Sequence, residues 1–371
     1  MGQEKQPSSE SKRGRLTNVG RYIDPAFAAL EVERVFRRAW LMVGLVNQLG
    51  ERGDYLTFDE LGESIVVLRD GEGALRAFHN TCRHRGTRLL EGTGNVQAIR
   101  CPYHDWKYAL DGRLRHVPDA GGFEELDRAK LHLFPVRVDA WGGFVFINLS
   151  EEEPQPLAET MAPLMEELEP YGLEDMIPIE EHVFTVPCNW KALLDNATES
   201  YHLPFVHKGS VDPHVATRPE FKTFGEHYRL TLGIADYWWR RWVDEQCSRR
   251  GPYSDKQLSS LHKYVAFPNF LFNVLPYHLT IFRIYPVDVN TCRFHYGFYK
   301  RKGASGLEWM RAYATWVASR YILLEDFKVL EAFQKGAVSG RNATHRFHAG
   351  EIAISHFHKV LSRWTGVSNI R

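Results

Sequence analysis

The sequence has few cysteines and no excess of charge of either sign. Only five cysteines stand among 371 residues, and 46 lysines and arginines balance 46 aspartates and glutamates. Three of these cysteines, Cys188, Cys247 and Cys292, are too few and too scattered for a disulfide framework, which favours a reducing, cytoplasmic location. The charge balance provides no net field that would attract nucleic acid or an anionic membrane.

Long apolar runs are also missing. Residues 1–17 are polar and charged and lack the apolar core of a signal peptide, and no later run reaches the length that spans a bilayer. We therefore expect a disordered tail over residues 1–17 and no membrane partner. The length of the chain allows two domains with apolar cores of ordinary size.

The other two cysteines each stand close to a histidine. Cys82 and His84 form one pair and Cys101 and His104 the other, so that together they supply two thiolates and two imidazoles. This is the ligand set of a Rieske 2Fe-2S cluster, in which two histidines replace two cysteines on one iron. A Cys2His2 zinc site, the alternative, usually pairs cysteine with cysteine and histidine with histidine along the chain. The mixed pairs therefore favour a one-electron relay.

The pattern of apolar residues divides the chain into segments. Residues 18–40 contain a predicted helix from Pro25 to Trp40, residues 41–150 read as a small all-β domain, and the acidic, proline-containing stretch 151–156 marks a linker. Residues 151–371 form the second predicted domain, of mixed helices and strands. The expected elements there are strands over 228–234, 264–274, 280–286 and 292–299, and helices over 307–334 and 351–364.

A second group of potential metal ligands lies in the second domain. Glu199 and His202 are three residues apart, so on a helix they share one face. Pro204 disfavours helix at Leu203, which allows the chain to turn and bring His207 back toward the same point. Non-haem Fe(II) oxygenases use two histidines and one carboxylate on one face of the metal. The two histidines are therefore candidate ligands, and an acid remains to be found.

Glu199 is one candidate for that acid, and the predicted helix 307–334 offers another. Asp326 interrupts an apolar stripe there, formed by Ile322, Leu323, Val329, Leu330 and Phe333. A buried carboxylate must be paired or bound to a metal. Glu325 lies on the adjacent face with Lys328 three residues on, an arrangement typical of a surface ion pair. The periodicity favours Asp326 over Glu325.

With both motifs in this order, the chain resembles the catalytic α subunits of Rieske non-haem iron oxygenases. The resemblance implies an α+β fold, with an all-β Rieske domain and a helix-grip (START-like) catalytic domain that has an antiparallel sheet and long C-terminal helices. It implies that the helix in residues 18–40 packs on the catalytic domain. It assigns Cys82, His84, Cys101 and His104 to the cluster, and His202, His207 and Asp326 to mononuclear Fe(II).

The resemblance also implies an assembly. Members of the family form head-to-tail trimers, alone or as α3β3, in which the cluster of one subunit faces the mononuclear iron of the next. An acidic residue three positions before the first histidine ligand links the two sites, which makes Glu199 the expected bridge between His202 and a neighbour's His104. Most ring-dihydroxylating members carry Asp at this position. Members that oxidise quaternary amines carry Glu, but so do many unassigned members, so the residue leaves the reaction type open.

Electrons must reach such a protein from a partner. No glycine-rich flavin fingerprint follows a strand, so electrons from NAD(P)H are expected to arrive through a ferredoxin, a flavin reductase or both. Basic side chains surround the cluster loops and can attract an acidic donor, although an ordinary solvated loop explains them equally well. They are Arg83, Arg85, Lys107, Arg113 and Arg115.

The predicted activity is therefore that of an oxygenase that uses O2 to hydroxylate an aromatic or other hydrophobic small molecule. The alternative within the class is monooxygenation that cleaves or demethylates a quaternary amine of the carnitine or betaine type. An aromatic cluster, Tyr237, Trp238, Trp239 and Trp242, can cage such a cation, although packing is the commoner role of large aromatics. Outside the class, the alternatives are a Rieske electron carrier without oxygen chemistry and a zinc-stabilised binding module.

Overall fold

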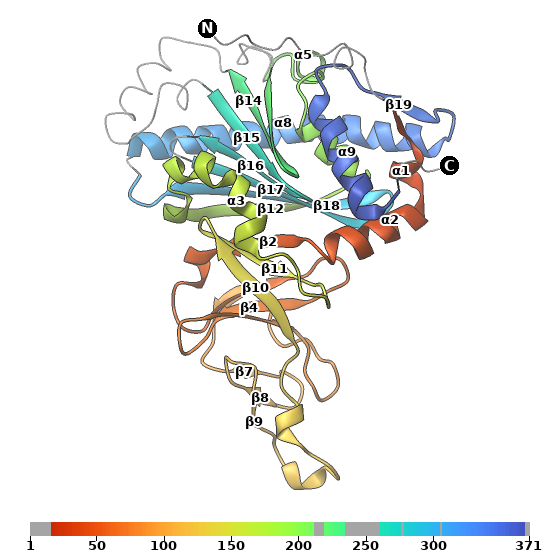
Figure 1. Ribbon diagram of the computed structural model, residues 1–371. Helices are drawn as coiled ribbons and strands as arrows, with labels where there is room; N and C mark the ends of the chain where they lie inside the picture. The colour runs from red at the N-terminus through yellow and green to blue at the C-terminus, as the bar shows by residue number, and fades with distance from the viewer. Residues whose placement is uncertain (1–15, 211–218, 234–259, 276–277, 305, 368–371) are drawn as a thin grey trace. The chain divides into compact units, whose positions relative to one another are not determined.

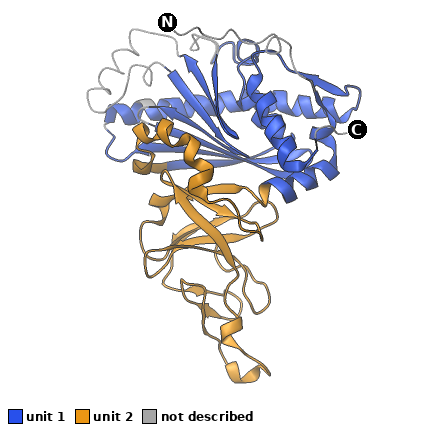
Figure 2. Cartoon of the chain, in the orientation of Figure 1, with its two compact units in different colours: residues 1–35, 179–371 blue, residues 36–178 orange. Residues whose placement is uncertain are grey.

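The computed structural model describes residues 16–210, 219–233, 260–275, 278–304 and 306–367. The chain forms two compact units, residues 36–178 and residues 1–35 together with 179–371, which are coloured separately in Figure 2. Both contain antiparallel sheets, and helices accompany the second sheet (Figure 1), so the α+β fold class is confirmed. The sequence pattern places residues 151–178 in the second domain, whereas in the structure they lie in the unit of residues 36–178.

The unit of residues 36–178 is built on a sheet of seven strands. Its strands, in spatial order, are β2 (Trp40–Leu45), β11 (Phe144–Asn148), β10 (Pro135–Trp141), β5 (Leu75–His79), β4 (Ile65–Arg69), β3 (Asp54–Phe58) and β6 (Thr93–Asn95). A smaller sheet joins β7 (Ile99–Arg100), β8 (Lys107–Tyr108) and β9 (Leu114–His116). The helix α3 (Leu157–Leu168) follows the sheets. As the Asp-Gly pairs predict, Asp70-Gly71 turns β4 into β5 and Asp111-Gly112 turns β8 into β9.

The other unit is built on a second seven-stranded antiparallel sheet. Its spatial order is β12 (Met176–Val186), β18 (Thr291–Arg301), β17 (His278–Asp288), β16 (Phe270–Leu275), β15 (Ser260–Ala266), β14 (His227–Gly233) and β13 (Glu220–Phe224). The strand predicted over 264–274 is thus two strands, β15 and β16, paired as a hairpin. Pro268 lies between them, and a proline cannot donate a hydrogen bond within a strand.

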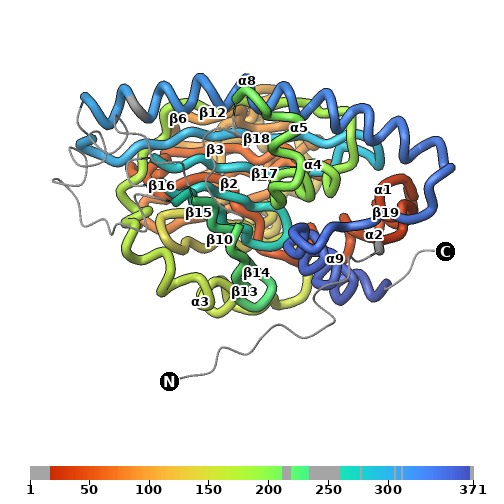
Figure 3. The backbone as a smooth tube through the Cα atoms, turned by 90° about the horizontal axis from the view of Figure 1, so that it is seen from above, coloured from red at the N-terminus to blue at the C-terminus, as the bar shows by residue number. Residues whose placement is uncertain are grey.

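Helices accompany this second sheet. α8 (Gly306–Val338) runs beside α4 (Trp190–Ala197) and α5 (Leu203–Val206) and packs on β18 (Figure 3). The remaining elements are α1 (Gly20–Ile23), α2 (Pro25–Glu31), α9 (Ile352–Thr365) and the strand pair β1 (Leu16–Asn18) with β19 (Thr344–Arg346). The helix predicted over 25–40 is shorter: α2 continues as a π-helical segment, Val32–Phe36, and a strand begins at Trp40.

The described part of the chain contains no helix that is long and apolar enough to cross a membrane.

Candidate functional site

Two cysteines and two histidines meet in the unit of residues 36–178, one pair on the loop between β5 and β6 and the other on the loop between β7 and β8. Cys82 and Cys101 are each 3% exposed, and the rings of His84 and His104 lie with centroids 4.7 Å apart. Trp106 stacks on the His84 ring at 5.0 Å. The sequence pairs therefore come together in space.

The burial and contacts of these four residues suit a 2Fe-2S cluster. The Nδ1 atoms of both His84 and His104 are buried without a hydrogen-bond partner, as is expected of nitrogens reserved for a metal. Burial raises the pKa of the Cys82 thiol, because a buried thiolate is unfavourable without a partner. Iron would bind the thiolate and so compensate for its burial. Tyr108 adds a contact to the sulfur, with its hydroxyl oxygen 3.3 Å from Cys82 Sγ.

The basic residues around these loops are largely engaged inside their own unit. Arg113 pairs with Asp111 at 2.5 Å and Lys107 with Asp105 at 3.3 Å. Arg83 donates to the carbonyl of His132 at 3.0 Å. Arg115 lies 4.0 Å from Asp111, and Arg85 lies over the Tyr103 ring at 5.3 Å. Docking of an electron donor at these residues stays a prediction.

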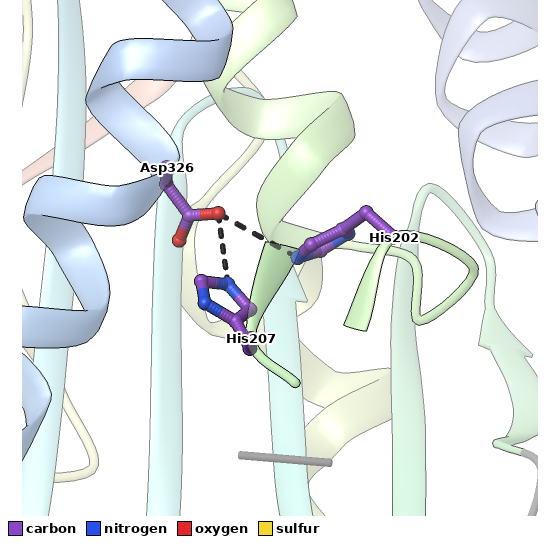
Figure 4. A group of neighbouring side chains, drawn as sticks. All are labelled: His202, His207 and Asp326. Atoms are coloured by element: carbon purple, nitrogen blue, oxygen red, sulfur yellow. Dashed lines mark hydrogen bonds and ion pairs between the residues drawn. The ribbon is translucent and has the colours of Figure 1, made fainter. Parts of the chain in front are cut away.

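The other unit brings His202, His207 and Asp326 together, as Figure 4 shows. Their ligand atoms lie within 4.8 Å of one another. Oδ1 of Asp326 is 2.9 Å from Nε2 of His207 and 3.6 Å from Nε2 of His202. Both imidazoles thus present Nε2 to one carboxylate, in the set of two nitrogens and one oxygen that suits ferrous iron.

The local backbone differs from the helix expected around Glu199. α4 ends at Ala197, because the Thr198 hydroxyl turns back to donate to the Leu194 carbonyl at 2.9 Å. Glu199 and His202 therefore lie on a non-helical turn, where the Glu199 carboxylate still hydrogen-bonds His202 Nδ1 and accepts from the His202 backbone N–H at 3.2 Å. Pro204 occupies the first turn of α5, which begins at Leu203, so the expectation of no helix at Leu203 was wrong.

Each histidine of the group has a second carboxylate behind it. Nδ1 of His202 bonds Glu199, and Nδ1 of His207 bonds Oε2 of Glu325 at 2.8 Å. Ser210 also donates to Glu325 at 2.8 Å. Carboxylates in this position fix the tautomer and orientation of a ligating imidazole. The surface ion pair predicted for Glu325 was therefore an incomplete description, because its closest partners are His207 and Ser210.

The electrostatics follow from these contacts. Burial opposes protonation of His207, but hydrogen bonds to Asp326 and Glu325 outweigh it and raise the pKa of His207. The hydrogen bond from His207, with that from Ser210, lowers the pKa of Glu325. Asn196 donates to Asp326 Oδ1 at 2.9 Å, a contact that sequence reasoning missed. A proton and a metal ion would therefore compete for Nε2 of His207.

The apolar stripe expected around Asp326 holds only in part. Leu330 is 4% exposed, whereas Val329 is 48% exposed and faces solvent. Asp326 itself is 14% exposed at its side chain. The aromatic cluster Tyr237, Trp238, Trp239 and Trp242 lies outside the described residues.

Comparisons with known families match both units. Residues 39–132 match the Rieske [2Fe-2S] domain, and residues 173–366 match the ring hydroxylating alpha subunit (catalytic domain). The chain belongs to the Rieske non-haem iron oxygenases. It is an enzyme of that class, with a 2Fe-2S domain and a catalytic domain for mononuclear iron, and it receives electrons from a reductase partner. The zinc-module and electron-carrier alternatives are wrong, because the matches include both a 2Fe-2S domain and a catalytic domain.

Individual relatives of this Rieske oxygenase are informative. The carnitine monooxygenase oxygenase subunit of Escherichia coli (strain K12) is 31% identical over 365 residues, which cover 92% of this chain and 91% of that protein. The glycine betaine monooxygenase oxygenase subunit of Chromohalobacter salexigens is 37% identical over 187 residues, 50% of this chain and 42% of that protein. The crystal structure of the quaternary ammonium Rieske monooxygenase CntA with L-carnitine superposes with a TM-score of 0.82 at 25% identity, covering 98% and 99% of the two chains.

Proposed function

We propose that this Rieske oxygenase is the terminal component of a monooxygenase that oxidises a quaternary amine. The observation that carries the oxygenase chemistry of this proposal is the convergence of two imidazole nitrogens and one carboxylate at His202, His207 and Asp326. We assign the iron to these three residues. The cluster ligands in this proposal are Cys82, His84, Cys101 and His104.

Iron held by His202, His207 and Asp326 would supply a site at which O2 and a C–H bond can react. The overall monooxygenation would place one oxygen atom of O2 in the C–H bond beside nitrogen and release the other as water, with two electrons from the reductase partner and two protons from solvent. The residues of the chain hold the geometry. Glu199 and Glu325 orient the two imidazoles, and Asn196 orients Asp326.

The choice of substrate rests on the comparisons. Relatives that match over most of the chain carry names of carnitine and choline monooxygenases. Naphthalene 1,2-dioxygenase from Rhodococcus has a TM-score of 0.79 but 19% identity, which speaks only for a common fold. The alternative from the sequence, a quaternary amine, is therefore better supported than the aromatic substrate first expected.

We extend the proposal to the assembly. In a head-to-tail homotrimer, Glu199 would connect His202 with His104 of the partner subunit and so link cluster to iron. Two features support this role. The Glu199 side chain is 7% exposed and already bonds His202, and the Nδ1 atom of His104 is buried and unpaired, which leaves Nε2 as the atom available to a neighbour. A reductase, with or without a ferredoxin, would supply the electrons.

The test is a substrate screen with the iron-loaded protein, NADH and a surrogate reductase. Carnitine, choline and glycine betaine are compared with naphthalene, and O2 uptake is scored together with organic product. We expect a tertiary or demethylated amine from a quaternary amine and no diol from naphthalene. The variants His202→Ala and Asp326→Ala should lose both iron at this site and product, while keeping the colour of the cluster. A diol from naphthalene, with no turnover of any amine, would overturn the proposal.

A further inference from the structure

Lys263 is a cation at the sheet face beside the proposed iron site. It lies on β15, is partly buried, and donates from Nζ to the carbonyl oxygen of Ala197 at 2.5 Å. Ala197 is the last residue of α4 and follows Asn196, whose amide bonds Asp326. Lys263 is thereby tied to the backbone next to the iron site.

The ammonium group of Lys263 keeps unused capacity. It can donate three hydrogen bonds, and within the described ranges its single partner is the Ala197 carbonyl. No carboxylate of a described residue lies within ion-pair distance of it. Burial lowers the pKa of Lys263, while the charges of Asp326 and Glu199 raise it from a greater distance. An unpaired ammonium in this position is costly unless an anion joins it.

Two further polar side chains share the face of Lys263. Antiparallel register places Lys263 opposite Asn273 on β16, and Asn273 opposite Thr280 on β17. Residues directly opposite on antiparallel strands project from the same face of the sheet. Because Lys263 reaches α4, this row lies on the helix-covered face, with Leu230 and Phe298 as its apolar neighbours.

Both of these side chains carry a buried atom without a partner. Oδ1 of Asn273 and Oγ1 of Thr280 make no hydrogen bond in the described structure, and Thr280 is only 4% exposed. Buried polar groups are almost always satisfied, so each exception calls for a ligand or a water. An ammonium, a hydroxyl and an amide in one row offer several donors to a single anion. The amide of Asn273 can turn to present its NH2 group.

We infer that Lys263, Asn273 and Thr280 form a subsite for the carboxylate of the substrate, so that the preferred substrate is a zwitterion that carries both a quaternary ammonium and a carboxylate. The inference rests on the proposed function and narrows it. It separates carboxylated amines such as glycine betaine and carnitine from amino alcohols such as choline. Lys263 would then act on specificity, as a residue that touches the substrate away from the reacting carbon.

Three probes of nearly equal shape separate the two charges. Glycine betaine has both, its methyl ester keeps the ammonium alone, and 3,3-dimethylbutanoate keeps the carboxylate alone. Binding to the iron-loaded holoenzyme is measured anaerobically by equilibrium dialysis, which needs no turnover. We expect Lys263→Met to weaken glycine betaine and 3,3-dimethylbutanoate roughly 10-fold or more, and the ester hardly at all, because a hydrogen-bonded charge is lost only for the acids.

Matched variants guard against a general effect on folding. Thr280→Val should weaken the acids about 3- to 10-fold, because it removes one hydroxyl while conserving side-chain volume. Lys263→Arg should restore part of the binding. The control is Lys222→Met, at an exposed lysine on β13 of the same sheet, which should change none of the three affinities.

Equal weakening of acid and ester in Lys263→Met would overturn the carboxylate subsite, because it would show that Lys263 only holds the end of α4. The subsite would also be overturned if Lys263→Met changed the affinity of none of the probes. The same conclusion would follow if the acids kept their affinity in both Lys263→Met and Thr280→Val, because an ordered water alone would then hold the carboxylate. The proposed function is judged separately. If 3,3-dimethylbutanoate binds as well as glycine betaine while the ester does not bind, the ammonium plays no part and the quaternary-amine proposal fails, although the carboxylate subsite stands.

Discussion

His207 and Glu325 are joined by a hydrogen bond of 2.8 Å between Nδ1 and Oε2, on the side of the imidazole that faces away from Asp326. The bond fixes the nitrogen that carries the proton, so that Nε2 is free to bind metal. It also makes the imidazole more electron-rich. Glu325 thus contributes to the proposed iron site without touching the metal.

The first prediction concerns this carboxylate. Glu325→Gln should weaken iron binding at the mononuclear site roughly 10-fold, because the neutral amide orients His207 but no longer adds negative charge behind the metal-bound imidazole. Iron retained after dialysis against a chelator, with cluster iron counted separately, measures the effect. Glu331→Gln is the control, since Glu331 lies on the same helix and pairs with exposed Lys335 at 2.6 Å. Equal iron retention in both variants would contradict the role of Glu325.

A second prediction addresses the cluster. In the iron-bound protein the hydroxyl of Tyr108 would donate to the Cys82 sulfur, from which it is 3.3 Å away. Hydrogen bonds to the sulfurs raise the potential of such clusters. Tyr108→Phe should therefore lower the reduction potential by about 40 mV, the equivalent of a hydrogen bond of about 1 kcal/mol for one electron. A redox titration followed by EPR measures it.

The control for that variant is Tyr103→Phe. Tyr103 lies in the second cluster loop, but its side chain is exposed and its hydroxyl bonds Arg85 at 3.5 Å rather than a sulfur. The reduction potential of the cluster in Tyr103→Phe should match that in the parent protein. A shift of similar size in both variants would show that the loss of a tyrosine hydroxyl near the cluster, and not the bond to sulfur, sets the potential.

The sequence predicts features that depend on neighbours along the chain. Cys82 with His84 and Cys101 with His104 are local pairs, and so are the hairpin turns at Asp70-Gly71 and Asp111-Gly112. Periodicity likewise identifies the strand β14 and the helix α9 within a residue of their ends. The fold class follows from these local signals combined with the family resemblance.

Contacts between distant residues are harder to predict. Glu325 meets His207 across 118 positions, and only the tertiary fold brings them together. The helical periodicity predicted Glu325 beside Lys328 because it describes only contacts within a single helix. The turn at Glu199 was missed for a different reason: the hydroxyl of Thr198 competes with the helical hydrogen bonds of α4 and ends the helix early.

A third prediction tests a buried ion pair between α4 and α2. Lys191 Nζ lies 2.8 Å from Glu31 Oε2, with side chains 0% and 1% exposed, and Trp190 donates to the same oxygen at 3.1 Å. Lys191→Met should cost about 3–5 kcal/mol of stability, because it leaves the Glu31 charge buried without its partner. Calorimetry of the thermal transition gives the measurement. The double variant Glu31→Gln/Lys191→Met should recover much of the loss.

An exposed pair on the same unit provides the comparison. Lys335→Met removes an ion pair whose lysine is 74% exposed, and such pairs contribute about 0–1 kcal/mol. If the double variant at Glu31 and Lys191 were no more stable than Lys191→Met alone, the loss would come from packing rather than from an uncompensated charge.

The last prediction uses pH. Burial opposes ionisation of Glu181 on β12, but Arg283 at 2.5 Å, with His295 at 3.1 Å and Tyr299 at 3.5 Å, outweighs burial and lowers the pKa of Glu181 to about 2. The unfolded chain has a pKa near 4.5 at this group. A carboxyl whose pKa is lower in the folded state stabilises the fold above the unfolded pKa, and that contribution is lost as the pH falls toward the folded value.

Glu181→Gln should therefore be less stable than the parent by about 1–2 kcal/mol at pH 7. This difference is smaller than the pKa shift alone implies, because about a third of the Glu181 side chain is exposed and water screens its charge. The difference should stay constant down to about pH 5, shrink below pH 4.5 and vanish near pH 2. Urea unfolding of both proteins between pH 7 and pH 3 measures it. A difference that does not change with pH would mean that shape and hydrogen bonding at Glu181, rather than its charge beside Arg283, stabilise the contact between β12, β17 and β18.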